Sequence, residues 1–525
     1  MGVADGENVT GPSVLHHEAD VPRAREREQA RERAEAPACF GDLHLDQVIA
    51  TITKGRDAYR LRPFFHVPLA DADAVAYRHE VFRDLADEAL RAHVEAFAGA
   101  MRSLRECSAQ AGVLRDANQR RRLRLDAAST YCTAVTRLAR ALHHAELHSR
   151  GLRRLASYLR VYVASDPFTA LQAETARIGR QLDAVRYDLT LYPDRVAVRK
   201  GTDGADDGAG VGRTFARFAE QPTAPRAAAV PPSFAMNMVE SAILERLTRL
   251  YPEVFVDLET FAERHGDYLD PTVTAFDREV QFYLAYLDYM ARFEDAGLGF
   301  CFPAVSASDK AVRVTGAFDA ALAHALLEEG GMVVCNDFHL SGEERIFLVT
   351  GANQGGKTTF ARMVGQVHFL ASLGCPVPAS RAEVCLFDEL LTHFEKVEDL
   401  DLLRGKLQDE LLRLHELLER ATPRSILIVN EVFASTTADD ARYLGRRVLD
   451  RLLKLGLVGV WVTFVEELAS FDPRIVSVVS TVDPANALRR TFKLLRRPAD
   501  GHAHALAIAK AHRLTYDELR SRLRS

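Results

Sequence analysis

The sequence lacks the long apolar runs that cross a bilayer. In its 525 residues no apolar stretch approaches the roughly 20 residues that a membrane-spanning helix needs. Residues 1–20 also lack the basic start and apolar core of a secretory signal. The seven cysteines are odd in number and form no C-x-x-C pair, which favours a reducing compartment and argues against structural zinc. These absences predict a cytoplasmic protein without a membrane partner.

The sequence also lacks an excess of positive charge. Its 67 Lys and Arg residues face 73 Asp and Glu residues, for a formal net charge of -6. Contact with nucleic acid would therefore need a local basic patch or an encircling shape. Arginines gather at 120–124 and again at 150–160, where they could line a phosphate-facing surface. A solvated helix face is the favoured alternative, because arginine is plentiful throughout the chain.

Length and pattern divide the chain into several regions. Residues 1–40 are predicted to be a disordered charged tail, since 23–33 alternates in sign with almost no apolar side chains. A DNA-binding arm is the alternative, but the acids there nearly cancel the arginines. Over 41–330 apolar residues recur at helical spacing, which predicts an elongated, mainly α-helical domain. A flexible linker at about 199–232 interrupts it, as expected for arms that run out and return.

The pattern changes to alternating strands and helices over 331–525, which predicts an α/β P-loop NTPase domain. An apolar run of strand character ends at Gly351, four residues follow, and Gly356-Lys357-Thr358 opens a segment of helical pattern. This order completes G-x-x-x-x-G-K-[ST], the phosphate-binding loop. The strand before it and the helix after it make a chance match improbable.

The loop predicts the ligands of ATP and Mg²⁺. Its glycines let backbone N–H groups point inward around phosphate oxygens at a helix N-terminus. Lys357 would reach the β- and γ-phosphates, and the Thr358 hydroxyl would bind Mg²⁺. The predicted nucleotide-binding residues are Gly351, Asn353, Gly355, Gly356, Lys357, Thr358 and Thr359.

A second apolar run, 425–430, ends in Asn430 and Glu431. P-loop sites usually hold an aspartate at the first position, which orients Mg²⁺ and its waters. Asn430 can still accept a hydrogen bond from a metal-bound water, but it contributes no charge, so Mg²⁺ should be held less tightly. Glu431 is the predicted catalytic residue that positions the attacking water. The expected activity is slow ATP hydrolysis.

These motifs together resemble the C-terminal ATPase domain of the MutS family over about 331–515. The residues that carry the resemblance are 351–359, Gly374-Cys-Pro-Val-Pro-Ala379, 421–431, Ser435-Thr-Thr-Ala-Asp-Asp-Ala441, Thr491-Phe-Lys493 and Ala507-Ile-Ala-Lys510. The helical half is similar in kind to the MutS core and lever domains. The resemblance implies a homodimer whose two ATPase sites are completed across the interface, with levers that clasp DNA.

The sequence departs from the family pattern at several points. The first Phe-x-Glu lies in the linker at 218–220, so we expect no mismatch wedge and no N-terminal mismatch-recognition domains. The family's Ser-Thr-Phe-Met signature is replaced around 405–410, and its switch histidine corresponds to Phe464, which cannot hydrogen-bond a phosphate. No room is expected for a C-terminal nuclease domain.

The function predicted from the sequence is that of a MutS-like DNA-repair ATPase. ATP binding and slow hydrolysis would set the geometry of helical arms around mismatched, branched or otherwise unusual DNA. The alternative is a nucleotide-gated, largely non-hydrolysing DNA or protein scaffold. An ABC-type or SMC-like ATPase is a third hypothesis, but it would need much longer heptad arms. Trp461 is the single tryptophan, and its fluorescence is expected to report nucleotide binding.

Overall fold

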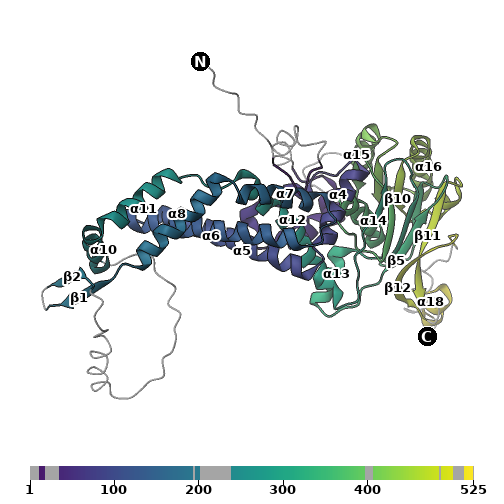
Figure 1. Ribbon diagram of the computed structural model, residues 1–525. Helices are drawn as coiled ribbons and strands as arrows, with labels where there is room; N and C mark the ends of the chain where they lie inside the picture. Colours follow the sequence, from purple (N-terminus) through teal and green to yellow (C-terminus); the bar gives the residue numbers. More distant parts are fainter. Residues whose placement is uncertain are drawn as a thin grey trace. The chain divides into compact units, whose positions relative to one another are not determined.

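The computed structural model describes residues 11–17, 35–192, 195–201, 238–395, 406–483, 486–499 and 514–523. The segment 23–33, most of the predicted linker and the tripeptide 218–220 lie outside this part of the chain. The chain forms two compact units (Figure 1). One comprises residues 1–87, 148–152 and 278–525, and we call it the ATPase unit; the other comprises 88–147 and 153–277, and we call it the helical unit. Among the described residues, every helix is too short or too polar to span a bilayer.

The helical unit is built from long amphipathic helices. They are α5 (Glu88–Val113), α6 (Ala117–His144), most of α7 (Arg150–Val163), α8 (Asp166–Asp183), α10 (Met238–Leu250), α11 (Pro252–Arg264) and the start of α12 (Pro271–Glu294). In α5 the buried residues Leu90, Val94, Phe97 and Met101 recur every three or four positions, so one face packs inward. The short strands β1 (Tyr187–Leu191) and β2 (Val196–Lys200) form an antiparallel hairpin.

The arginines at 120–124 are engaged within the helical unit. Arg121 pairs with Glu259, and Arg122 Nε donates to Asp126 across one turn of α6 at 3.0 Å. Arg120 Nη1 donates to two backbone carbonyls just before the helix, at 2.8 Å each. These contacts favour the solvated, ion-paired helix face over a dedicated phosphate-binding surface.

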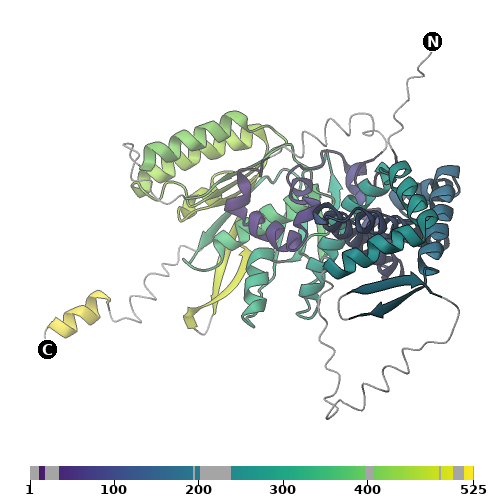
Figure 2. The ribbon, with the colours of Figure 1, turned by 90° about the vertical axis from the view of Figure 1, so that its left-hand side faces the viewer.

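A twisted six-stranded sheet forms the centre of the ATPase unit, seen from two sides in Figures 1 and 2. Its order is β12 (Asn486–Arg496), β11 (Ile475–Asp483), β6 (Ile346–Gly351), β10 (Val458–Val462), β9 (Ile426–Asn430) and β8 (Leu390–His393). Neighbouring strands are parallel except β11 and β12. The carboxyl ends of β6 and β9 therefore lie on the same edge of the sheet. This is the α/β arrangement that the sequence predicts.

Helices bury both faces of the central strands β6, β10 and β9, which explains why these three strands are mostly apolar. On one face Leu348, Val429 and Trp461 join a core with α15 (Lys406–Arg420) and α16 (Ala438–Leu455). On the other face lies α14 (Lys357–Ser372), which packs so closely that a Cβ at Gly365 would stand 2.8 Å from Ile428. It would also stand 2.7 Å from Leu43 of α2 (Cys39–Leu43).

A second, four-stranded sheet lies beside the first within the ATPase unit. Its order is β3 (Ala304–Ser306), β7 (Arg381–Cys385), β4 (Val312–Ala317) and β5 (Asn336–Leu340), and α13 (Ala320–Glu328) follows β4. Asn336 joins the two sheets, because its Nδ2 donates to Phe492 O at 3.1 Å and its Oδ1 accepts from Leu494 N at 2.8 Å. This amide fixes β12 beside the start of β5.

Part of the segment predicted to be a solvated tail is instead buried. Val14 and Leu15 are almost inaccessible, and Val14 N donates to Glu279 Oε2 at 2.7 Å. The fully buried Arg78 of α4 (Ala72–Asp84) donates to Leu15 O and, at 2.7 Å, to Leu373 O. The tail prediction is therefore wrong for these residues, because two apolar side chains in a polar stretch find a matched site far along the chain.

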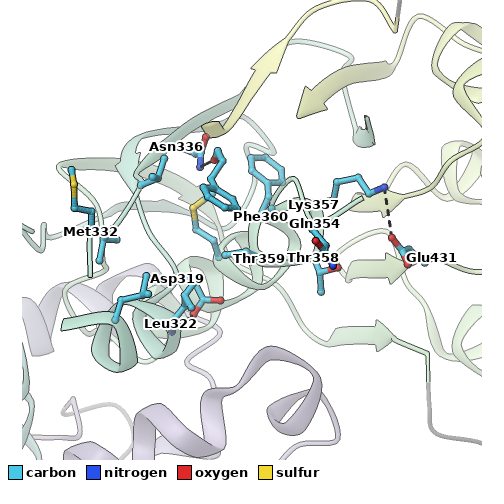
Figure 3. Close-up of a pocket in the computed structure, with 16 residues that line it drawn as sticks. Asp319, Leu322, Met332, Asn336, Gln354, Lys357, Thr358, Thr359, Phe360 and Glu431 are labelled. Carbon is cyan, nitrogen blue, oxygen red and sulfur yellow. Dashed lines mark hydrogen bonds and ion pairs between the residues drawn. The ribbon is translucent and has the colours of Figure 1, made fainter. Parts of the chain in front are cut away.

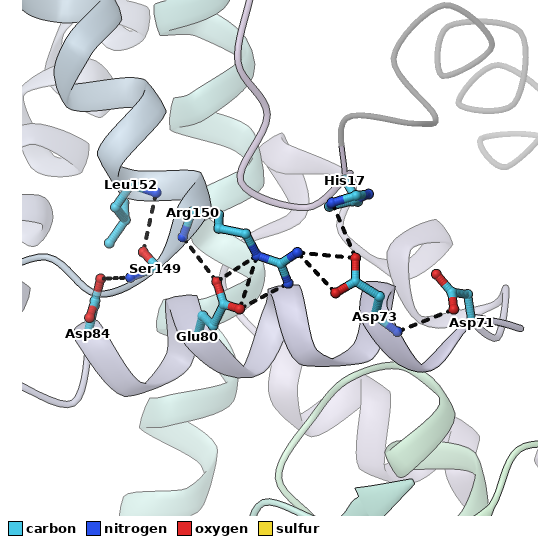
Figure 4. Close-up of polar contacts among 8 residues, drawn as sticks. All are labelled: His17, Asp71, Asp73, Glu80, Asp84, Ser149, Arg150 and Leu152. Carbon is cyan, nitrogen blue, oxygen red and sulfur yellow. Dashed lines mark hydrogen bonds and ion pairs between the residues drawn. The ribbon is translucent and has the colours of Figure 1, made fainter. Parts of the chain in front are cut away.

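The first turn of α7 is bound to α4 by charged groups (Figure 4). The Arg150 guanidinium lies 2.9 Å from Glu80 and 3.0 Å from Asp73, and His17 also contacts Asp73 at 3.2 Å. Asp84 accepts from the backbone N of Ser149 at 2.9 Å, which satisfies a helix N-terminus with an anion. Arg150 therefore has a structural role in the ATPase unit.

Candidate nucleotide site

The phosphate-binding loop lies between β6 and α14, as the sequence predicts. Gly351 has a φ of +109° and Gly356 a φ of +89°, values that other residues rarely adopt. A Cβ at Gly351 or Gly355 would stand 2.5 or 2.6 Å from the Ser480 hydroxyl of β11. The close approach of β11 therefore disfavours a side chain at Gly351 and Gly355, and at Gly351 the backbone conformation disfavours it as well.

Lys357 is held inside the loop (Figure 3). Its Nζ donates to Gly351 O at 3.0 Å and to Asn353 Oδ1 at 3.2 Å, and it lies 3.7 Å from Glu431 Oε1. The side chain is only 3% exposed. Burial lowers the pKa of Lys357, and the nearby Glu431 carboxylate opposes that shift. The ammonium group is thus poorly solvated, which favours the approach of an anion.

The two residues predicted to hold the metal are adjacent. Thr358 is the second residue of α14. Its Oγ1 donates a hydrogen bond of 3.0 Å to Oδ1 of Asn430, the last residue of β9. Hydroxyl and amide oxygens are hard ligands of the kind that Mg²⁺ accepts. The side chains at this position therefore fit a magnesium ion, with Thr358 as a direct ligand and Asn430 beside it.

Glu431 follows β9 in a sharply turned backbone. Its N–H donates to Val462 O at 3.0 Å, and its φ of +54° is unusual for a residue with a side chain. Phe433 has a φ of +64°. This turn directs the Glu431 carboxylate toward Lys357, where the predicted catalytic residue would have to lie.

A cavity of about 400 Å³ extends from the loop. Its polar end is lined by Gln354, Gly356, Lys357, Thr358, Thr359 and Glu431. Its other end is mainly apolar, although Asp319 and Asn336 also line the cavity, and it includes Leu322, Leu326, Met332, Val333, Val334 and Phe492. The cavity thus offers a charged end and an apolar end, the two kinds of environment that the phosphates and the base of a nucleotide require.

Sequence reasoning missed the apolar end. The signal available was the apolar run 332–334 at the start of the predicted ATPase domain, together with Phe492 inside a motif already noted. Of the predicted binding residues, Gly351, Asn353 and Gly355 shape the loop and do not line the cavity.

Phe464 also lies away from this cavity. Its side chain is 48% exposed, and it lines a separate groove on the same unit with Glu466 and Arg497. Phe464 is thus not among the residues that line the candidate nucleotide cavity of its own chain.

The C-terminal part of the chain matches known proteins. Residues 347–513 match the family described as MutS domain V. A DNA mismatch repair protein MutS from Lactobacillus gasseri is 27% identical over 205 residues, which are 38% of this chain and 24% of the relative. An Endonuclease MutS2 from Gemmatimonas aurantiaca is 29% identical over 196 residues, 37% of this chain and 24% of the relative.

A longer match joins the chain to a DNA mismatch repair protein MutS from Lactobacillus delbrueckii subsp. bulgaricus. It is 27% identical over 281 residues, which are 52% of this chain and 31% of the relative. The chain thus spans only about a quarter to a third of the length of these relatives. With a P-loop and a buried second strand in the matched segment, residues 347–513 are thus identified as a MutS domain V, and this part of the chain is similar to MutS and MutS2 proteins.

Proposed function

We propose that the chain binds Mg-ATP in the cavity beside the phosphate-binding loop. The convergence of Lys357, the Thr358–Asn430 pair and Glu431 on one end of that cavity carries the proposal. The triphosphate would lie over the loop amides and the start of α14, where N–H groups and a buried ammonium favour anions. The base would lie toward 332–334 and Phe492.

We propose further that Glu431 positions and activates the water that attacks the γ-phosphate. A Mg²⁺ ion bound at Thr358 would neutralise charge on the phosphate oxygens. In the structure Glu431 faces Lys357, so the triphosphate must draw the ammonium away before the carboxylate can act on water. Asn430 supplies no charge to the metal. Both features favour slow hydrolysis.

The biological setting proposed is DNA repair, because the relatives include proteins named for mismatch repair. The nucleotide state would set the geometry of the helical arms around mismatched, branched or otherwise unusual DNA, in a homodimer joined through the ATPase unit. A nucleotide-gated scaffold with little hydrolysis is the second candidate. The neutral Asn430 and the exposed Phe464 favour it.

The experiment that tests the nucleotide proposal is calorimetry with Mg-ATP on the full chain. Lys357→Ala should weaken binding at least about tenfold, or roughly 1.4 kcal/mol. Lys454→Ala is the matched control, because Lys454 is an exposed lysine of α16 that pairs with Asp450. No uptake by the wild type, or equal uptake by Lys357→Ala, would overturn the proposal.

Phosphate release separates the two candidate functions. Steady-state release that falls in Glu431→Gln supports the ATPase, whereas tight Mg-ATP binding without release supports the scaffold. If Glu431→Gln releases phosphate at the same rate as the wild type, Glu431 is not the residue that activates the water.

The DNA proposal is tested by binding to homoduplex, mismatched and branched DNA, each with ATP or ADP and over a range of salt. Binding that depends on the nucleotide supports it. No binding to any of these DNAs in either nucleotide state refutes it.

A further inference from the structure

A buried carboxylate lies behind the turn that carries Glu431. Glu410 is near the start of α15 and is only 6% exposed. Its Oε2 accepts a hydrogen bond from the backbone N of Phe433 at 3.2 Å. Burying a charged group is costly unless hydrogen bonds compensate it, so a carboxylate aimed at a backbone amide indicates a specific role.

The backbone that Glu410 contacts is strained. Glu431 and Phe433 both have φ values in the left-handed region, at +54° and +64°. Non-glycine residues keep such conformations only where their surroundings impose them, and such residues gather at functional sites. Two hydrogen bonds hold this turn: Glu431 N to Val462 O at 3.0 Å, and Phe433 N to Glu410. One joins the turn to the sheet, and the other joins it to α15.

We propose that Glu410 is a positioning residue for Glu431. By fixing the Phe433 amide it keeps the turn in the conformation that directs the Glu431 carboxylate toward Lys357 and the end of the cavity. Glu410 does not line the cavity, so it would act through Glu431 and not on the nucleotide itself. The inference rests on the proposed ATPase function, and it makes the position of α15 a determinant of the hydrolysis rate. A shift of this helix would slow hydrolysis while leaving the phosphate-binding loop intact.

Three substitutions distinguish this role from general stabilisation. Glu410→Ala removes the acceptor, Glu410→Asp keeps the charge but withdraws it by one methylene group, and Glu410→Gln keeps an acceptor oxygen at full reach. If Glu410 positions Glu431, the Glu410→Gln variant should keep most of kcat, whereas the Glu410→Asp and Glu410→Ala variants should each lower kcat by about tenfold or more. The Kd for Mg-ATP should stay within about twofold in all three. Glu416→Ala is the control, because Glu416 is exposed on the same helix.

Two results would overturn the inference. One is the reverse order, in which Glu410→Asp keeps its kcat and Glu410→Gln loses it. The other is a loss of Mg-ATP affinity that parallels the loss of kcat. If Glu410→Ala fails to fold, the comparison of Asp with Gln still decides. The double variant Glu410→Ala/Glu431→Gln should hydrolyse ATP no more slowly than Glu431→Gln alone, since Glu410 acts through Glu431. Independent, additive losses would refute that coupling.

The wild type separates this inference from the function on which it rests. No phosphate release by the wild type overturns the proposed ATPase, and the inference falls with it. Normal release by the wild type and by Glu410→Ala overturns the inference alone.

Discussion

Two buried histidines should make the ATPase unit sensitive to mild acid. His79 of α4 and His368 of α14 are 4% and 1% exposed. Burial lowers the pKa of each to about 4 from 6.5, and the nearby Arg83 adds to the shift at His79. The His368 Nδ1 lies 2.8 Å from Val364 O, as expected for a neutral ring that donates there. Its Nε2 has no hydrogen-bond partner among the described residues.

The sign of the effect follows from proton linkage. In the unfolded chain these histidines take up protons below a pKa of 6.5, whereas in the folded unit they resist protonation down to about 4. Protons therefore favour the unfolded state within that window, and stability is lost as the pH falls through it. Between about pH 7.5 and about pH 5.5 each histidine should cost about 1.4 kcal/mol of unfolding free energy.

Urea unfolding followed by Trp461 fluorescence measures this loss, because the single tryptophan is buried in the core of the ATPase unit. Wild type should lose about 3 kcal/mol between the two pH values from these histidines together. His368→Gln, which cannot titrate, should lose about half as much. His415→Gln is the control, since His415 is exposed on α15. The reasoning is refuted if His368→Gln and wild type show the same pH dependence.

Four further substitutions test the packing. Gly355→Ala should abolish Mg-ATP binding without unfolding the chain, because its Cβ would stand 2.8 Å from Ala352 O; retained binding in calorimetry would contradict this. Gly365→Ala should destabilise the ATPase unit by about 2 kcal/mol through overpacking. Gly99→Ala should instead stabilise the helical unit by about 0.5–1 kcal/mol, because a Cβ at this position in α5 would have nothing within 4 Å. Scanning calorimetry in which Gly365→Ala and Gly99→Ala shift stability in the same direction would refute this contrast. Arg78→Ala removes two hydrogen bonds to buried carbonyls and should cost about 3 kcal/mol in urea unfolding, and a loss below about 1 kcal/mol would contradict its role.

The features predicted from the sequence are those that depend on residues close together in the chain. The loop before Lys357 was predicted because glycines, lysine and threonine stand at fixed spacing between a strand and a helix. The strands that end at Gly351 and at Asn430 were predicted because a strand covered on both faces needs a continuous apolar run. The Thr358–Asn430 pair was predicted because P-loop sites usually hold a metal-orienting residue at the end of a second apolar strand.

The features that escaped prediction join residues far apart in the chain. Val14 is fixed by Glu279, and the apolar end of the cavity joins 332–334 to Phe492. Glu410 reaches the Phe433 amide from a helix whose pattern indicates only a leucine stripe. In each case the local pattern determines the element, whereas the partner is determined by how the elements pack. A one-sequence pattern contains no such information.

The charge environment of Lys357 affects the proposed binding of Mg-ATP and its proposed hydrolysis differently. Its pair with Glu431 spans 3.7 Å, and Glu431 is 32% exposed, so solvent screening limits the pair to about 1 kcal/mol or less. Burial of the ammonium is the larger influence, because the pKa of Lys357 is lowered despite that pair. A triphosphate would offer more charge and more oxygens than Glu431 does. Lys357 should therefore exchange the Glu431 carboxylate for a phosphate of the nucleotide. The released Glu431 can then act on water only if the turn at Phe433 keeps its shape.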